Sequence, residues 1–177
     1  ERRFDLIFNG NMNYPPNITS AEFLVQKVLP IVRKQHPNVM LLLSGSSPHQ
    51  RVKALASENV VVSGWIDDIR ENYAKSLINI APMQISIGMQ NKILEAMAMQ
   101  MPCIASRGAN DAIGATSEEH ILVAETPQEY AIHIDALLTQ EHLRNKIANG
   151  GHKFVMDKYQ WSTTTIGLEQ LFSGHSS

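Results

Sequence analysis

The stretch Ser86–Ser106, SIGMQNKILEAMAMQMPCIAS, reads as a loop, then a helix, then a strand. The helix is predicted over Gln90–Gln100, where Pro102 stops it. The strand is predicted over Cys103–Ala105. Although most of the helix is apolar, its first turns carry three polar side chains: Asn91, Lys92 and Glu95. A buried helix has little use for them, whereas a helix whose N-terminus faces an anionic ligand does.

The same alternation of apolar runs and helical patterns extends along most of the chain. Six runs are apolar throughout, as expected of strands buried on both faces. They are Phe4–Phe8, Val39–Leu43, Val60–Val62, Ile78–Ala81, Cys103–Ala105 and Ile121–Val123. After Val123 the pattern is helical only. This order predicts an α/β fold: a Rossmann-like, doubly wound parallel sheet of about six strands with C-terminal helices.

The helices are predicted from apolar periodicity and from capping residues. They cover Ser20–Gln35 with Thr19 or Ser20 as its cap, Pro48–Ala56, a segment from Asp68 to Ser76, Gln90–Gln100, a segment opening at Thr126–Glu129, Glu141–Tyr159 and Ser162–Phe172. We expect the tail 173–177 to be frayed.

Composition bounds the class of protein. The 177 residues, 44% hydrophobic and 18% charged, fit one domain over 1–177. A net charge of -2 gives no electrostatic signature for nucleic acid or an acidic membrane. Cys103 is the only cysteine, which excludes intrachain disulfides and thiolate clusters and favours a reducing compartment. We expect Cys103 to be a core residue.

Glycine-containing loops follow five of the predicted strands. They contain Gly10, Ser44-Gly45-Ser46, Ser63-Gly64-Trp65, Pro82–Gly88 and Ser106-Arg107-Gly108. Glycine suits such turns in any case, but ligands of open α/β sheets bind at this rim. Five such loops on one rim therefore favour a flat or phosphorylated ligand.

The start of the helix at Gln90 has two interpretations. Its free N–H groups, from Gly88 to Asn91, and the Lys92 ammonium could attract phosphate, while Glu95 could accept hydrogen bonds from a ribose diol. Alternatively, Lys92 and Glu95 form an intrahelical ion pair on a solvated face. The residues alone leave both interpretations open.

Residues Gly88–Ser106 resemble the donor-site segment of GT-B glycosyltransferases of the retaining family four (group 1), in which Leu-Glu-Ala-Met-Ala precedes Gly-x-Pro-Val-Val. FNGNMNYPPN at Phe8–Asn17, NVVVSGWIDDIRENYAKSLINIAPM and DKYQWS fit the same family. The form Asn-Lys-x-Leu-Glu-Ala-Met-Ala is most similar to bacterial sugar transferases of exopolysaccharide synthesis. The resemblance covers essentially the whole chain and corresponds to the C-terminal, donor-binding half of such an enzyme, so we expect the acceptor domain to lie outside it.

The resemblance implies transfer of a hexosyl group from a nucleoside diphosphate sugar to a glycan or lipid-linked acceptor. Its site residues carry over by position. The ribose would be held by Glu95, and the diphosphate would contact Gly88 and Met89, followed by Gln90 and Asn91. The base would be lined by Gly64, Trp65 and Ile66, beside Ser44 and Gly45. The cleft between the two domains would be faced by Gly10 and Asn11. Glu95 and Lys92 are the predicted catalytic residues.

The sequence departs from the family at several positions. Ile87 stands where many members carry a second glutamate, and Gln100 stands where glycine is frequent. The family's basic pair after the first strand is missing between Asn11 and Asn17, with Pro16 at the lysine position. Lys92 is our candidate for the missing charge. Asn17-Ile18-Thr19 matches a glycosylation sequon, which we interpret as a helix entry.

We expect no cofactor and no metal, because the donor is a substrate and Asp67-Asp68 lacks the spacing of a metal–diphosphate motif. The expected partners are the sugar nucleotide and an acceptor that binds the other half of the enzyme. We expect that other half to associate peripherally with a membrane. No nucleic acid is expected as a partner. The expected location is the cytoplasm, at the inner face of the membrane. We expect the isolated domain to be inactive.

Other functions are compatible with some of these features. A GT-B half without catalysis, serving as a binding or interaction module, and a UDP-sugar epimerase are the alternatives. A dinucleotide dehydrogenase would require Gly-x-Gly-x-x-Gly after the first strand, and NGNMNYPPN lacks it. The nucleotide base, the sugar, the acceptor and the oligomeric state are not encoded in any motif that we identify.

Overall fold

The computed structural model describes residues 3–64, 67–83 and 90–160, with side chains described up to Lys158. Within these ranges, six parallel strands form one sheet in the order β3-β2-β1-β4-β5-β6. The strands are β1 Phe4–Asn9, β2 Leu41–Ser44, β3 Val60–Val62, β4 Ser76–Ala81, β5 Cys103–Ala105 and β6 Leu122–Val123. All six predicted strands are confirmed, and so is the doubly wound fold.

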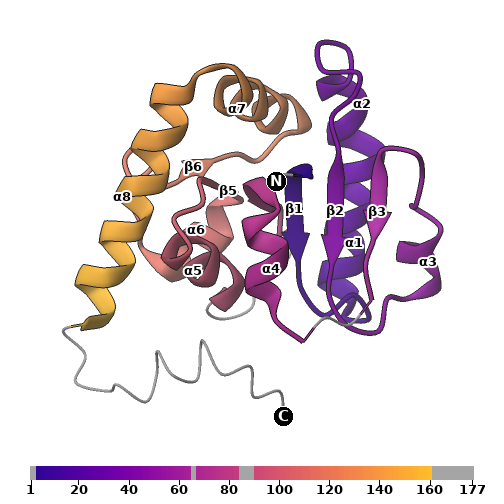
Figure 1. The fold of residues 1–177 in the computed structure, drawn as a ribbon, viewed down its shortest axis with the longest axis horizontal. Helices are drawn as coiled ribbons and strands as arrows, with labels where there is room; N and C mark the ends of the chain where they lie inside the picture. The colour runs from indigo at the N-terminus through magenta and orange to yellow at the C-terminus, as the bar shows by residue number, and fades with distance from the viewer. Residues whose placement is uncertain (1–2, 65–66, 84–89, 161–177) are drawn as a thin grey trace.

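The helices cover both faces of the sheet (Figure 1). They are α1 Pro15–Phe23, the π-helical turn η1 Leu24–Val28, α2 Leu29–Val32, α3 Gln50–Lys53, α4 Ile69–Ala74, α5 Asn91–Ala98, α6 Arg107–Ile113, α7 Pro127–Thr139 and α8 Glu141–Gln160. Helix α7 packs on η1 and α2, and α8 packs on α5 and α7. None of the helices in the described ranges is both long and apolar enough to cross a membrane.

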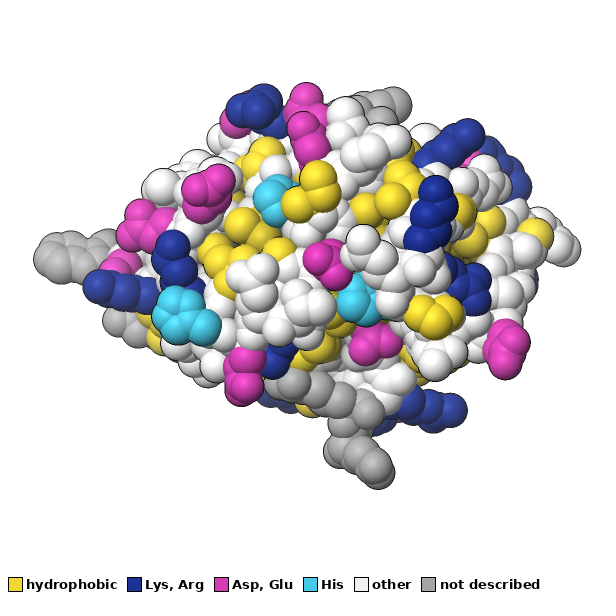
Figure 2. All heavy atoms as spheres, turned by 90° about the horizontal axis from the view of Figure 1, so that it is seen from above, with side chains coloured by type: hydrophobic (Ala, Val, Ile, Leu, Met, Phe, Trp, Pro, Cys, Tyr) yellow, Lys and Arg dark blue, Asp and Glu magenta, His cyan; other side chains and the backbone are white. Residues whose placement is uncertain are grey.

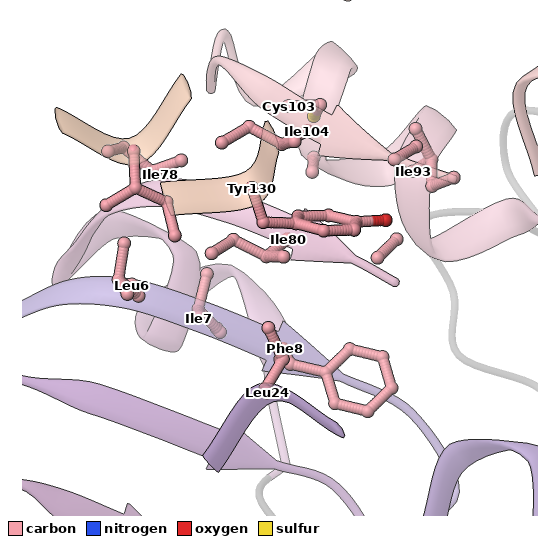
Figure 3. Close-up of a cluster of buried hydrophobic side chains, with 14 of the residues drawn as sticks. Leu6, Ile7, Phe8, Leu24, Ile78, Ile80, Ile93, Cys103, Ile104 and Tyr130 are labelled. Atoms are coloured by element: carbon pink, nitrogen blue, oxygen red, sulfur yellow. The ribbon is translucent and has the colours of Figure 1, made fainter. Parts of the chain in front are cut away.

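The core lies on both sides of β1 and β4. Leu6, Ile7 and Phe8 are successive residues that point alternately to the two faces, yet all three are fully buried. Figure 3 shows them beside Ile78 and Ile80, with Tyr130 of α7 packed against the same cluster. This burial on both faces explains why the strands are apolar throughout.

Cys103 belongs to this core, as expected. It is 1% exposed, and burial raises the pKa of its thiol to about 12. The thiol is therefore protonated at neutral pH and packs as a small apolar side chain.

The first helix differs from its prediction in its start and in its interior. The first helix begins at Pro15, not Ser20, because proline's missing N–H and fixed φ suit the first turn. The predicted cap Ser20 instead lies inside the helix, where its hydroxyl donates to the Pro16 carbonyl at 2.8 Å. The π-helical turn η1 precedes Pro30, which cannot donate to a carbonyl one turn back.

Helix α6 is not among the predicted helices. Its sequence, RGANDAI, contains helix-weakening Gly108, Asn110 and Asp111, but Ser106 caps it by accepting from the Ala109 N–H. The predicted caps Asp68 and Thr126 are confirmed, the latter in a capping box with Glu129. The predicted helix Ser162–Phe172 and the tail 173–177 lie outside the described residues.

Candidate functional site

The strand order reverses between β1 and β4, which are neighbours in the sheet although β2 and β3 come between them in the sequence. At such a switch point, the loops that follow the two strands diverge to opposite faces and leave a crevice at the carboxyl ends. Here the loop from Gly10 to Tyr14 follows β1, and α5 begins beyond β4. In Figure 1 this rim is the lower edge of the sheet. The opposite edge, seen in Figure 2, carries charges of both signs among apolar side chains.

Lys92 on the first turn of α5 reaches the first turn of α1, the helix that follows the loop after β1. Its ammonium donates to Asn17 Oδ1 at 2.7 Å, contacts Met83 Sδ at 3.6 Å and lies 5.1 Å from the centroid of the Phe8 ring. All three partners are neutral. The ammonium therefore turns to Asn17 rather than to Glu95, which the alternative of an intrahelical ion pair would require.

The electrostatic environment disfavours the charges of both Lys92 and Glu95. Burial lowers the pKa of the Lys92 ammonium to about 8, although Glu95 acts in the opposite direction. Burial likewise raises the pKa of the Glu95 carboxyl, and Lys92 offsets part of this rise. Ionisable groups whose pKa values are shifted by burial, at the carboxyl edge of a parallel sheet, are candidates for functional residues.

The glycines at positions 10 and 45 allow two rim loops to touch. Gly45 has a φ of +144°, and a Cβ on it would lie 1.7 Å from the Gly10 carbonyl oxygen. A Cβ on Gly10 would lie 2.7 Å from Asn17 Nδ2 and 3.1 Å from Lys92 Nζ. Packing between loops is therefore a sufficient reason for both glycines, and their contact with a ligand stays a prediction. A Cβ on Gly64 would meet nothing within 4 Å.

The remaining predicted site residues have different surroundings. Ser44 is fully buried, and its hydroxyl accepts from Asn72 Nδ2 at 2.9 Å, which ties β2 to α4. Asn11 is exposed, and its carbonyl accepts from Asn17 Nδ2 at 2.9 Å. Gln90 is the buried N-cap residue of α5, and Asn91 is its exposed first residue. Trp65, Ile66, Gly88 and Met89 lie outside the described residues, as does Ile87.

Residues 3–140 match the family model described as glycosyl transferases group 1. The chain belongs to this family. An uncharacterised 44.6 kDa protein in the cps region of Klebsiella pneumoniae is 24% identical over 171 residues, which cover 89% of this chain and 44% of that protein. The chain thus spans less than half the length of this curated relative.

Solved structures share the group 1 fold. The C-terminal domain of the glycosyl transferase group 1 family protein LpcC from Francisella tularensis has a TM-score of 0.70 at 23% identity, covering 88% of this chain and 86% of that domain. Anabaena Alr3699/HepE in complex with UDP and glucose has a TM-score of 0.74 at 14% identity, covering 97% of this chain and 49% of that protein. TarM has a TM-score of 0.76 at 16% identity, covering 97% of this chain and 36% of TarM.

Several residues around Lys92 were not among the predicted ones. Asn17 and Met83 contact the Lys92 ammonium. The Tyr73 hydroxyl donates to the Lys92 carbonyl at 3.2 Å and accepts from Asn9 Nδ2 at 3.3 Å, so α4 braces the first turn of α5. Burial, with Glu95 adding to it, raises the pKa of the Tyr73 hydroxyl, which stays protonated as this donor. These contacts join positions far apart in the chain, and no local motif signals them.

Other polar clusters of the group 1 domain lie away from the switch point. Two surface cavities, one beside α8 with His120 and Phe154 and one with Asp5 and His36, do not include Lys92 or Glu95. Over residues 3–64, 67–83 and 90–160, no group of three or more His, Cys, Asp and Glu side chains could hold a metal ion. The crevice between β1 and β4 is therefore the site that we analyse below.

Proposed function

We propose that the protein containing this chain transfers a hexosyl group from a nucleoside diphosphate sugar to a glycan or lipid-linked acceptor, and that this chain binds the donor. One observation carries the proposal: the Lys92 ammonium lies at the switch point of the sheet, and its contacts among the described residues, Asn17, Met83 and Phe8, are all neutral. A buried cation whose direct contacts are neutral suits an anionic ligand. Family membership and the UDP named in the HepE complex support a sugar nucleotide.

The proposed roles follow from charge development in the reaction. The bond between the anomeric carbon and the diphosphate oxygen breaks, the acceptor hydroxyl oxygen bonds to that carbon, and the hydroxyl proton is released. Negative charge grows on the leaving diphosphate, where Lys92 and the N–H groups at the start of α5 would stabilise it. Glu95, one turn further along α5, would accept hydrogen bonds from the ribose and fix the position of the donor.

Lys92 offers a physical explanation for the missing basic pair. The family's basic pair is missing between Asn11 and Asn17, with Pro16 at the lysine position, but the Lys92 ammonium lies 3.1 Å from where a Cβ on Gly10 would be. A lysine from α5 would thus place its charge beside the loop that lost it. The proposed reaction proceeds with retention, as in family four, needs no metal, and serves polysaccharide synthesis, which the cps-region relative supports.

The proposal is tested by titrating this chain calorimetrically with UDP, GDP, ADP and dTDP. For the nucleotide that binds, Lys92→Met and Glu95→Gln should each weaken binding by about 1–3 kcal/mol, because each removes a charge-assisted hydrogen bond. The Glu95→Gln effect should vanish with the 2′,3′-dideoxy nucleotide, which lacks the ribose hydroxyls.

Helix α4 offers matched controls in the exposed pair Lys75 and Glu71, whose ammonium and carboxylate lie 3.2 Å apart. Lys75→Met and Glu71→Gln should leave nucleotide affinity unchanged. If no nucleotide binds the unmodified chain, or if the rim variants bind as the controls do, the site assignment is wrong.

The second candidate is a GT-B half that binds sugar nucleotides without catalysis. Ile87, in place of the second family glutamate, favours it. Turnover of a radiolabelled sugar nucleotide by the full-length protein would exclude this candidate, whereas nucleotide binding without turnover would support it.

A further inference from the structure

We propose that Asn17 is a positioning residue: its carboxamide fixes the Lys92 ammonium over the loop after β1 and, being neutral, leaves the positive charge to the ligand. The inference rests on the proposed function. It concerns a residue that has no assigned role in the site so far and that acts through Lys92.

The orientation of the Asn17 amide is determined by its two partners. Asn17 is 4% exposed, and its Nδ2 donates to the Asn11 carbonyl at 2.9 Å. Its Oδ1 must therefore face the other way, where it accepts from Lys92 Nζ at 2.7 Å. The amide both donates to the loop carbonyl and accepts from the ammonium, whereas an aspartate would repel the carbonyl and neutralise the lysine.

The surroundings leave the ammonium little freedom. Met83 Sδ lies 3.6 Å away on one side, and the Phe8 ring, 5.1 Å away, lies below it. The Met83 thioether is itself held by the Ser20 hydroxyl at 3.6 Å. Gly10 completes the enclosure, because a Cβ there would lie within 3.1 Å of both Asn17 and Lys92 atoms.

The charge at Lys92 depends on all the groups that surround its ammonium. Among the described residues, the titratable groups facing Lys92 are Glu95 on its own helix and Tyr73 from α4, whose hydroxyl donates to the Lys92 carbonyl. From β1, α1 and the described part of the segment after β4, the facing groups are Phe8, Asn17 and Met83, all uncharged. The Lys92 ammonium therefore presents a positive charge to the crevice. One more carboxylate beside it would largely cancel that charge.

The test compares Asn17→Asp with Asn13→Asp, an exposed position in the loop that precedes α1. With the nucleoside diphosphate that binds the unmodified chain, Asn17→Asp should weaken affinity tenfold or more, while Asn13→Asp should change it less than threefold because solvent screens its charge. In the unmodified chain, affinity should fall as the pH rises past about 8, where Lys92 loses its proton. In Asn17→Asp this fall should move to higher pH, because the new carboxylate stabilises the ammonium.

A double-mutant cycle gives a second measurement that does not depend on the aspartate variant folding. Asn17→Ala should weaken binding in the presence of Lys92 and have no effect in the Lys92→Met background. Equal effects of Asn17→Asp and Asn13→Asp with unchanged pH profiles, or additive effects in the cycle, would overturn the inference while nucleotide binding itself persists. A chain that binds none of the four nucleotides would instead overturn the proposed function.

Discussion

Lys92 and Glu95 occupy an environment that opposes both of their charges. Burial lowers the pKa of Lys92 to about 8 and raises that of Glu95, so each charged form is less stable in the folded chain than in water. Groups retained at the expense of stability are common in binding sites. At the residue scale, this is the physical mark of the crevice between β1 and β4.

Lys92→Met should therefore stabilise the chain at pH 7, by about 1–3 kcal/mol. The lysine's folded pKa, about 8, lies below its usual 10.5. Its destabilising effect is therefore complete below pH 8 and fades between pH 8 and 10.5, as the folded chain loses the proton that the unfolded chain still holds. Urea unfolding at pH 7 and pH 10 measures this, with exposed Lys75→Met as the control. A less stable Lys92→Met at pH 7, or a stability gap equal at both pH values, would contradict it.

Lys92 and Glu95 could be identified as candidate site residues from the sequence, because they are charged residues in an otherwise apolar helix. It could not reveal Asn17 as the partner of Lys92. Asn17 and Lys92 are separated by 75 positions, and their hydrogen bond exists only because the start of α1 packs beside the start of α5. A side chain's partner at this distance depends on the packed sheet rather than on any local pattern.

Helix α8 is held against the domain by two adjacent glycines. A Cβ on Gly150 would lie 2.0 Å from the Glu119 carbonyl oxygen, and one on Gly151 would lie 2.7 Å from the His120 carbonyl oxygen. Helix α8 thus approaches the backbone before β6 more closely than a residue with a Cβ atom at position 150 or 151 would allow. At the scale of elements, this contact fixes α8 beside α5, which carries the proposed site.

Gly150→Ala should destabilise the chain by about 1–3 kcal/mol, because the new methyl group would collide with backbone that cannot move aside easily. At an exposed helix position the same change stabilises by up to about 1 kcal/mol. Asn145→Ala on the exposed side of α8 is the matched control, and thermal unfolding by circular dichroism measures both. A Gly150→Ala variant as stable as the unmodified chain would show that α8 is not packed this closely.

Elements buried on two faces were predicted well, whereas helix α6 and the start of the first helix were not. The strands are apolar because helices cover both sides of the sheet. Helix α6 escaped prediction because Gly108, Asn110 and Asp111 weaken its pattern, and its stability depends on the Ser106 cap and on packing. The first helix began earlier than expected because Pro15 and Pro16 act as initiators there rather than as breakers.

At the scale of the whole molecule, the group 1 domain has a six-stranded sheet whose strand order reverses between β1 and β4. The alternation of strands and helices was sufficient to predict this architecture and the edge of the sheet where a ligand would bind. The order of the strands in the sheet determines which loops meet at that edge. This order could not be read from the sequence.

The most direct test of our central claim is a crystal structure of this chain with the nucleoside diphosphate that binds it. We expect a diphosphate oxygen about 3 Å from Lys92 Nζ and a ribose hydroxyl within hydrogen-bond distance of Glu95. A nucleotide bound elsewhere, such as the cavity beside His120 and Phe154, with Lys92 and Glu95 in contact with no part of it, would contradict the account.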